Sequence, residues 1–371
     1  MRKQSMDFRK EEVSYVMKRW QAAESCALIG VGSVGKTNLL QHLIDPDVQK
    51  HYMGAKAQQF KAIVIDPNLL GPLPAPEKGN EPFRCWAGYE LMMHRLYLAF
   101  YPPELLGDDA MNFYETYQML QDGSNPLYSY MGLRYFELGL EFFLRRGIHI
   151  VLMFDEFEEM MRQMPVKFFQ TLRGLRDTHK SLLSYLVFAR APLSVLAEQH
   201  HVPEMEFEPF AELFTDNIYY VGPYNDEDSR VMLDRLMGRN QKASYPPHIA
   251  NFLMWSSGRY AGLMRAGFRM LDTLGGIAPE DMNSERLLEK LASRPPVRAE
   301  SETIWKSLTH VEQQVLKIIS GLEQQVANHE TEQAMSMLVQ KRLVSVDKTH
   351  QTLRIDPPLF RVYIHSNPSY S

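Results

Sequence analysis

The sequence is poor in cysteine, has no long apolar run and carries no strong excess of either charge. Its two cysteines, Cys26 and Cys85, have no metal-ligand spacing, and such low usage is typical of a reducing compartment. The longest apolar strings, such as residues 150–154, are too short to cross a bilayer. A net charge of −5 gives no global attraction to nucleic acid or to acidic membranes.

Repeats, low-complexity tracts and a secretory leader are also missing from the pattern. The first residues are basic, but no apolar segment follows them, so we expect a soluble cytoplasmic protein with no membrane association. What is present is ordinary for a globular chain: 45% of the residues are apolar and 23% are charged. A chain of 371 residues can hold two or three domains.

Residues 25–43, SCALIGVGSVGKTNLLQHL, fit two phosphate-binding motifs at once. Gly30, Gly32 and Gly35 match G-x-G-x-x-G, the fingerprint of dinucleotide-binding folds. The same stretch, extended to Lys36 and Thr37, matches G-x-x-x-x-G-K-S/T, the P-loop of nucleoside triphosphatases. Both motifs place phosphate on backbone N–H groups at the start of a helix.

The residues beyond the glycines favour the P-loop. A dinucleotide fold needs an acidic residue about 20 positions further on, at the end of the next strand, and Asp66 lies well beyond that distance. The P-loop explains both extra residues, because Lys36 can reach the β- and γ-phosphates and the Thr37 hydroxyl can ligate Mg²⁺. The predicted nucleotide-binding loop consists of Gly30, Val31, Gly32, Ser33, Val34, Gly35, Lys36, Thr37 and Asn38.

A second motif predicts the same chemistry. Residues 148–156, IHIVLMFDE, are typical of a strand that is buried on both faces and ends in two acids. In a P-loop ATPase the first of these, here Asp155, holds the metal with its water shell, and Glu156 is placed to orient or deprotonate the attacking water. Together the motifs predict binding of ATP with Mg²⁺ and its hydrolysis, with Thr37 and Asp155 on the metal.

The order of elements along the first part of the chain predicts an α/β domain. After a helix at 8–21, we expect strands at 26–30, 61–67, 148–156, 182–190 and 217–223, and helices at 36–43, 84–101, 131–146 and 166–178. Strands that alternate with helices form a parallel sheet with right-handed crossovers.

The second part of the chain is predicted to be mostly helical. Helices are expected at 226–237, 246–256, 259–273, 284–292, 310–320 and 330–341. The polar stretch 293–302, with two prolines, is predicted as a linker. A hairpin in LVSVDKTHQTLRID follows the last two helices, which is the outline of a winged helix. The predicted domains are 1–223 for the α/β core, 224–292 for a helical lid, 293–302 for the linker and 303–371 for the winged helix.

Taken in order, several segments resemble the STAND nucleoside triphosphatases, which are related to AAA+ and origin-recognition ATPases. These segments are GVGSVGKTNLL, VLMFDEFEEM, FFQTLRGLRD, LVFARAPLSVL, YYVGPYNDEDSRVML and SSGRYAGLMRAGFRML. The final part, LVQKRLVSVDKTHQTLRIDPPLFRVYI, is similar to the winged helix that closes such proteins. The resemblance covers residues 8–365 and implies a P-loop NTPase parallel sheet of order 5-1-4-3-2, an all-helical lid and a winged-helix domain.

Residue roles are implied by this resemblance position by position. Arg190 takes the sensor 1 place at the tip of the fourth strand, with a surface arginine at a strand end as the alternative, and Pro223 matches the proline that packs by the adenine. Arg259 or Arg265 takes the sensor 2 place on the lid, and a plain arginine on a helix surface is the alternative for each. DFRKEE near the start occupies the position of a GRE-like box, although the glycine is missing.

One departure from the family bears on the rate of the reaction. Ring-forming relatives carry an arginine finger shortly before the fifth strand, and here that segment, EFEPFAELFTDN, has no basic residue. Because such a finger accelerates hydrolysis by several orders of magnitude, we expect slow turnover and a nucleotide-dependent switch. Glu156, Lys36 and Arg190 are the expected catalytic residues.

The expected partners are ATP, ADP and a separately encoded protein effector or a second copy of the chain, since no effector domain is recognised. An ATP-dependent DNA-binding protein that uses the winged helix is the alternative. We do not favour it, because the bases of the predicted recognition helix, Lys341 and Arg342, stand only at its C-terminal end.

Overall fold

The computed structural model describes residues 4–123, 127–239, 247–271, 285–324, 328–347 and 352–366. The predicted hairpin turn at 348–351 and the helix margins at 246, 272–273 and 284 lie outside the described residues. The chain divides into two compact units. The sheet unit comprises Met1–Met6, Lys10–Ile29 and Leu40–Tyr219, and the P-loop unit comprises Asp7–Arg9, Gly30–Leu39 and Tyr220–Ser371.

A five-stranded sheet forms the centre of the sheet unit. The strands are β1 (Cys26–Ile29), β2 (Phe60–Ile65), β3 (His149–Phe154), β4 (Leu183–Ala189) and β5 (Ile218–Tyr220). Their order is β2-β3-β4-β1-β5, which is the predicted order counted from the other edge, and the first three pairs are parallel. β3 and β4 are buried almost throughout, as unbroken apolar sequences require when both faces are covered. The predicted α/β fold class is confirmed.

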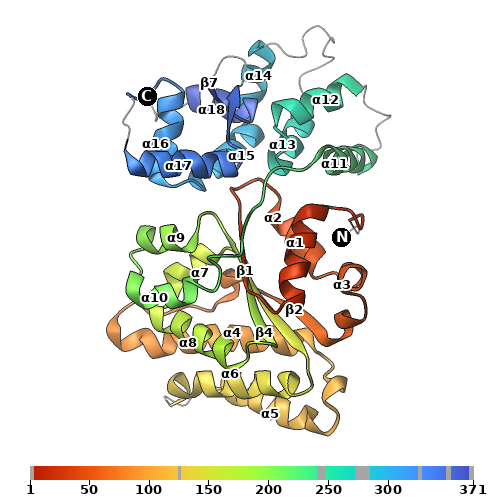
Figure 1. The fold of residues 1–371 in the computed structure, drawn as a ribbon, viewed down its shortest axis with the longest axis vertical. Coiled ribbons are helices and arrows are strands. Elements are labelled where there is room, and N and C mark those ends of the chain that lie inside the picture. Colours follow the sequence, from red (N-terminus) through yellow and green to blue (C-terminus); the bar gives the residue numbers. More distant parts are fainter. Residues whose placement is uncertain are drawn as a thin grey trace. The chain divides into compact units, whose positions relative to one another are not determined.

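Helices cover both faces of this sheet. In Figure 1, α1 and α3 lie on one side of it, and α9 and α10 lie on the other. The helices of this part of the chain are α1 (Lys10–Gln21), α2 (Lys36–Leu43), α3 (Pro46–Met53), α4 (Glu81–Ala99), α5 (Ala110–Gln121), α6 (Tyr128–Leu144), α7 (Phe157–Gln163), α8 (Val166–Thr178), α9 (Leu193–Gln199) and α10 (Glu204–Ala211). Helices α3, α5, α7, α9 and α10 were not predicted from the sequence. In α5, apolar residues lie on both faces, with Met111, Tyr114 and Met119 exposed.

The second half of the P-loop unit is almost entirely helical. Its helices are α11 (Asp226–Arg239), α12 (Pro247–Ser256), α13 (Ala261–Leu271), α14 (Glu285–Ala292), α15 (Pro295–Lys306), α16 (His310–Ile319), α17 (His329–Gln340) and α18 (Pro358–Ser366). An antiparallel hairpin of β6 (Val344–Asp347) and β7 (Thr352–Ile355) stands between the last two.

The predicted linker at 293–302 is wrong, because helix α15 begins at Pro295 and runs to Lys306. Both prolines stand in the first turn of the helix. Proline is tolerated there, since the N–H it lacks would have no intrahelical acceptor and its φ is already close to the helical value. Although this stretch of sequence is mostly polar, one side of helix α15 is buried, and that side includes Val297, Ile304 and Trp305. The prolines therefore start a helix instead of marking a flexible connection.

A fully buried ion pair joins α16 to the end of α17. Lys341 Nζ lies 2.6 Å from Glu312 Oε1, and both side chains are 0% exposed. The second carboxylate oxygen of Glu312 accepts the Thr309 N–H at 2.8 Å, which closes a capping box at the start of α16. The Tyr260 hydroxyl, whose pKa is raised by burial, donates to the Lys341 carbonyl at 2.9 Å. These contacts tie α13, α16 and α17 together.

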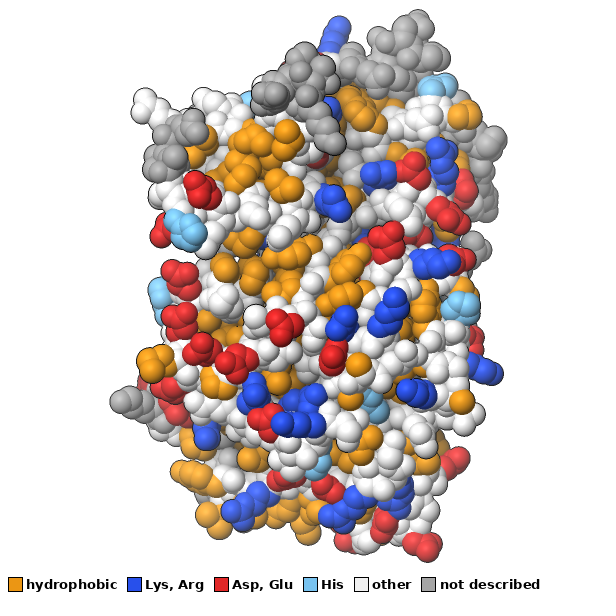
Figure 2. Space-filling model, in the orientation of Figure 1, with side chains coloured by type: hydrophobic (Ala, Val, Ile, Leu, Met, Phe, Trp, Pro, Cys, Tyr) orange, Lys and Arg blue, Asp and Glu red, His pale blue; other side chains and the backbone are white. Residues whose placement is uncertain are grey.

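The face of the molecule drawn in Figure 2 has mixed charge. On the face drawn in Figure 2, Lys and Arg side chains lie among Asp and Glu side chains instead of forming an extended field of one sign. Nucleic-acid-binding faces are usually marked by such a basic field. Among the described helices, none has both the length and the apolar character needed to cross a membrane.

We expect Glu312→Ala to destabilise the protein by about 3–5 kcal/mol, because the Lys341 ammonium would remain buried without its partner. Chemical denaturation followed by circular dichroism measures this. The matched control is Glu323→Ala, which removes the partly exposed partner of Lys317 and should cost less than about 1 kcal/mol. Equal losses in the two variants would contradict the importance of the buried pair.

Candidate functional site

The loop that joins β1 to α2, residues 30–35, has a conformation that depends on its glycines. Gly35 has φ +95°, which residues with side chains rarely adopt, and a β-carbon there would lie 3.0 Å from the Tyr224 hydroxyl. A β-carbon on Gly30 would lie 3.2 Å from the Val221 carbonyl oxygen. Helix α2 begins at Lys36, immediately after the loop. Its first N–H groups have no intrahelical acceptor and form the positive end of the helix dipole, which suits a phosphate.

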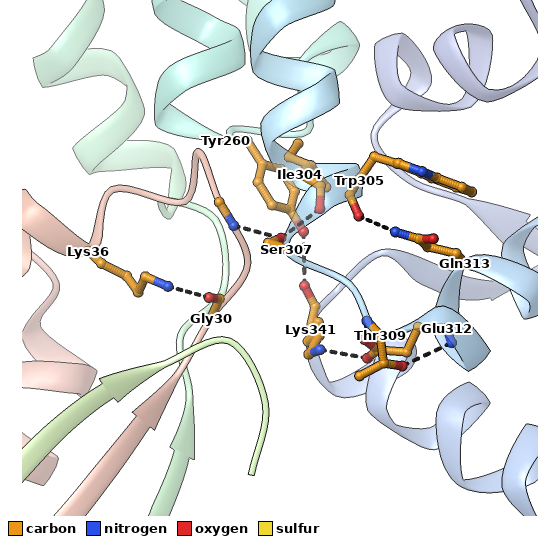
Figure 3. A network of polar contacts seen from close by, with 11 residues as sticks. Gly30, Lys36, Tyr260, Ile304, Trp305, Ser307, Thr309, Glu312, Gln313 and Lys341 are labelled. Atoms are coloured by element: carbon orange, nitrogen blue, oxygen red, sulfur yellow. Dashed lines mark hydrogen bonds and ion pairs between the residues drawn. The ribbon is translucent and has the colours of Figure 1, made fainter. Parts of the chain in front are cut away.

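The side chains at the start of α2 complete this cradle. Lys36 Nζ donates to the Gly30 carbonyl at 2.6 Å, so the ammonium group is held against the loop (Figure 3). Thr37 follows in the first turn of the helix. Asn38 Nδ2 donates to the Tyr224 hydroxyl at 2.9 Å. The loop has a conformation that requires glycine, a helix starts directly after it, and a lysine ammonium group lies against it. This combination fits the phosphate chain of a nucleotide.

Arg9 supports the loop from the other end of the chain. Its side chain is 1% exposed, and Nη2 donates to the Val34 carbonyl at 2.7 Å and to the Gly222 carbonyl at 3.0 Å. Its backbone N–H donates to the Asp228 carboxylate at 3.1 Å, and the guanidinium lies 4.7 Å from the centre of the Tyr224 ring. The segment DFRKEE, which lacks the glycine of the GRE-like box, therefore still brings its arginine to the loop.

A second group of predicted residues follows the strands of the sheet unit. β1, β4 and β3 are parallel neighbours, so their carboxyl ends lie at the same edge of the sheet. Asp155 follows β3, and its carboxylate accepts the N–H of Glu156 at 3.0 Å. Carboxyl ends of parallel strands are where α/β folds place their ligands.

Glu156 is held in an unusual conformation next to a residue that the sequence analysis missed. Its φ of 43° and ψ of 53° are left-handed, which is strained for a residue with a side chain. The Asn68 amide donates to the Glu156 carboxylate at 3.2 Å and to the Asp66 carboxylate at 2.9 Å. The available signal was the position of Asn68 just beyond β2, the strand next to β3.

Two of the three predicted sensor arginines are engaged by acidic side chains. Arg190 follows β4, and its Nε lies 2.7 Å from the Glu158 carboxylate, which is 8% exposed. Arg259 has φ +63° and forms an ion pair with Asp226. Arg265 is exposed on α13. The sensor roles of these arginines, including the choice between the two lid arginines, stay predictions.

The predicted residues therefore fall into two groups. Residues 30–38, Pro223 and Arg259 belong to the P-loop unit, whereas Asp155, Glu156 and Arg190 belong to the sheet unit. Among the described residues, no group of three or more His, Cys, Asp and Glu side chains is arranged to hold a metal ion. Magnesium in nucleotide sites is held by one or two protein oxygens together with phosphates and waters, and the Thr37 hydroxyl and the Asp155 carboxylate are donors of that kind.

Comparison with known proteins gives a fold and no family. No protein-family model and no curated protein matches the chain. The Walker-type ATPase paby2304 of Pyrococcus abyssi is 13% identical with a TM-score of 0.53, over 96% of this chain and 95% of that one. The Aeropyrum pernix ORC2 protein in ADPNP–ADP complexes is 12% identical, with a TM-score of 0.49 over 96% and 93%. Cdc6p from Pyrobaculum aerophilum is 11% identical, with a TM-score of 0.43 over 98% and 94%. The first likeness shows a shared fold; the other two scores are too low to carry an argument.

We expect Arg9→Ala to destabilise the protein by about 2–4 kcal/mol, because it leaves the Val34 and Gly222 carbonyls without the buried guanidinium that donates to them. Thermal and chemical denaturation measure the loss. Arg230→Ala, on the exposed side of α11, is the matched control and should change stability by less than about 0.5 kcal/mol. An Arg9→Ala protein as stable as the control would show that the arginine does not support the loop.

Proposed function

We propose that this chain binds ATP with Mg²⁺ at residues 30–37, hydrolyses it slowly and works as a nucleotide-dependent switch of the STAND and AAA+ type. The observation that carries the proposal is the loop before α2, with Gly35 at positive φ and Lys36 held against it. The fold shared with a Walker-type ATPase supports it. The acidic pair after β3 is the second feature that such an enzyme needs.

Each residue has a definite task in this proposal. N–H groups of the loop and of α2 bind the phosphates, and Lys36 offsets their charge. Thr37 and Asp155 hold Mg²⁺, which when bound neutralises developing charge on the phosphates. Glu156 orients or deprotonates the attacking water, and the hydrogen bond from Asn68 keeps its carboxylate in place.

Slow turnover follows from the composition of the segment before β5. Residues 206–217, which include most of α10, contain no Lys or Arg. The chain therefore supplies no arginine finger from this segment, and such a finger is worth roughly 10³–10⁵ in rate. A protein that holds its nucleotide for long periods is suited to switching.

The switching part of the proposal uses the C-terminal helices. Pro223 packs by the adenine. Arg190, and either Arg259 or Arg265 on the lid, act as sensors of the γ-phosphate, for which Arg190 leaves Glu158 and Arg259 leaves Asp226. Helices α16 and α17 with the hairpin β6–β7 form the winged helix, and a separately encoded effector or a second copy reads the nucleotide state. A ligand shifts such an equilibrium only by its differential affinity for the two states.

Lys36→Ala should weaken binding of a fluorescent ATP analogue at least about tenfold, because it removes a charge-assisted contact to phosphate. Titration of the purified protein measures the dissociation constant. Lys167→Ala, on the exposed side of α8, is the control and should bind as the wild type does. If Lys36→Ala and the wild type bound equally well, the loop would not be the nucleotide site.

Glu156→Gln should keep its affinity for ATP and lose about 10²-fold or more of its hydrolysis rate, because the amide keeps the shape and removes the base. Phosphate release at saturating ATP measures the rate. Asn68→Ala should give a smaller loss, about tenfold, through misplacement of the carboxylate. Glu159→Gln, one turn along α7, serves as the control. Wild-type turnover in Glu156→Gln would exclude Glu156 as the base.

A further inference from the structure

One side of helix α15 lies directly against the P-loop. Glu300, Thr303 and the capping residue Ser307 are spaced by three and four positions, which places them on the same face of a helix. We call these three residues the α15 face. None of the three has a role predicted from the sequence, in which residues 293–302 are a predicted linker and 303–371 a predicted winged-helix domain.

Ser307 makes a hydrogen bond to the loop backbone. The Gly32 N–H donates to Ser307 Oγ at 2.9 Å, and the same hydroxyl donates to the Ile304 carbonyl at 2.6 Å. Figure 3 shows Ser307 beside the loop, between α15 and the capped start of α16. The hydroxyl therefore holds the end of α15 to the loop.

Thr303 explains why the loop has glycine at position 32. A β-carbon on Gly32 would lie 2.6 Å from the Thr303 methyl carbon and 2.7 Å from the Thr303 carbonyl oxygen. The carbonyl is part of the helix and cannot move aside alone. The close packing of loop on helix thus needs a residue without a side chain at this position.

Glu300 brings a negative charge to the loop. Its carboxylate oxygen Oε2 and the Ser33 hydroxyl both lie so close to Gly262 that a β-carbon on Gly262 would collide with the two of them. Ser33 is itself fixed there, because its carbonyl accepts the Gly262 N–H at 2.9 Å and its hydroxyl accepts the Leu263 N–H at 3.1 Å. The carboxylate of Glu300 is therefore next to a residue of the phosphate-binding loop.

We propose that Glu300, held against the P-loop by the α15 face, is a specificity-determining residue that makes the site favour a nucleoside diphosphate over a triphosphate. The proposal rests on the proposed function, since it concerns the nucleotide bound at residues 30–37. It adds a cause for switching that the nucleotide motifs do not contain: the same carboxylate opposes binding of the triphosphate more than it opposes binding of the diphosphate.

The physical reason is repulsion between like charges. Phosphates held by the loop lie within a Debye length of the Glu300 carboxylate, so salt does not screen them fully. ATP carries about one unit of negative charge more than ADP, whether or not each binds Mg²⁺. For charges about one Debye length apart, with an effective dielectric constant near that of a protein surface, Coulomb's law weakens binding of the more highly charged nucleotide roughly three- to tenfold relative to the other.

The experiment measures the dissociation constants of fluorescent ATP and ADP analogues in proteins that differ in the charge at position 300. The ratio of the two constants is then compared between these proteins. We expect Glu300→Gln to lower the ratio of the ATP constant to the ADP constant roughly three- to tenfold, and Glu300→Lys to lower it further. Glu302→Gln is the matched control, because Glu302 lies on another face of α15 and is paired with Lys306 at 2.7 Å. Its ratio should equal that of the wild type. Thermal unfolding confirms that each variant is folded.

The outcomes separate this inference from the proposed function. If the wild type showed no Lys36-dependent binding of either nucleotide, the proposed function itself would fail. If binding depended on Lys36 but the ratio were the same in the wild type, Glu300→Gln and Glu300→Lys, the role of Glu300 alone would be overturned. An equal drop in Glu302→Gln would also overturn it, because the effect would then belong to the general charge of the helix.

Discussion

The loop between β1 and α2 is held by hydrogen bonds from segments that are far away in the sequence. Arg9 binds the Val34 carbonyl, Gly262 binds the Ser33 carbonyl, and Ser307 accepts the Gly32 N–H. A short loop rich in glycine has few side chains with which to satisfy its own backbone, and buried N–H and C=O groups need partners. This requirement explains why residues 7–9, 30–39 and 220–371 form one compact unit.

Left-handed backbone conformations occur in both groups of candidate-site residues. Of the seven non-glycine residues with positive φ among the described residues, Arg9, Ser33 and Arg259 belong to the P-loop unit and Glu156 belongs to the sheet unit. Each such conformation costs of order 1–3 kcal/mol and persists only where the surrounding structure enforces it. Glu156 follows β3, which is buried almost throughout.

Electrostatics gives the candidate site a character that its motifs do not show. The arginines expected to sense phosphate are paired with acids, Arg190 with Glu158 and Arg259 with Asp226. Meanwhile Glu300 places a carboxylate near the loop. Within the P-loop unit, Arg259 is thus already engaged by an acid, while the Glu300 carboxylate lies next to Ser33 of the loop.

The residues of the two motifs could be predicted from the sequence because each motif is local. The glycines with Lys36 and Thr37, and an apolar strand ending in Asp155 and Glu156, are patterns within one strand and its following turn. The strands were also predictable, since burial on both faces requires unbroken apolar runs. Their order came from the resemblance to known P-loop ATPases.

By itself, then, the sequence determined the strands, most of the helices, the phosphate loop and the acidic strand end, all of which depend on neighbouring residues. Only the tertiary structure decided that residues 295–306 are a helix against the loop, that Arg9 is buried under it, and that Asn68 holds Glu156. The physical reason is that each of these depends on contacts between residues distant in the chain. Burial and hydrogen-bond partners, which decide whether a polar stretch becomes a linker or a packed helix, exist only once the chain has folded.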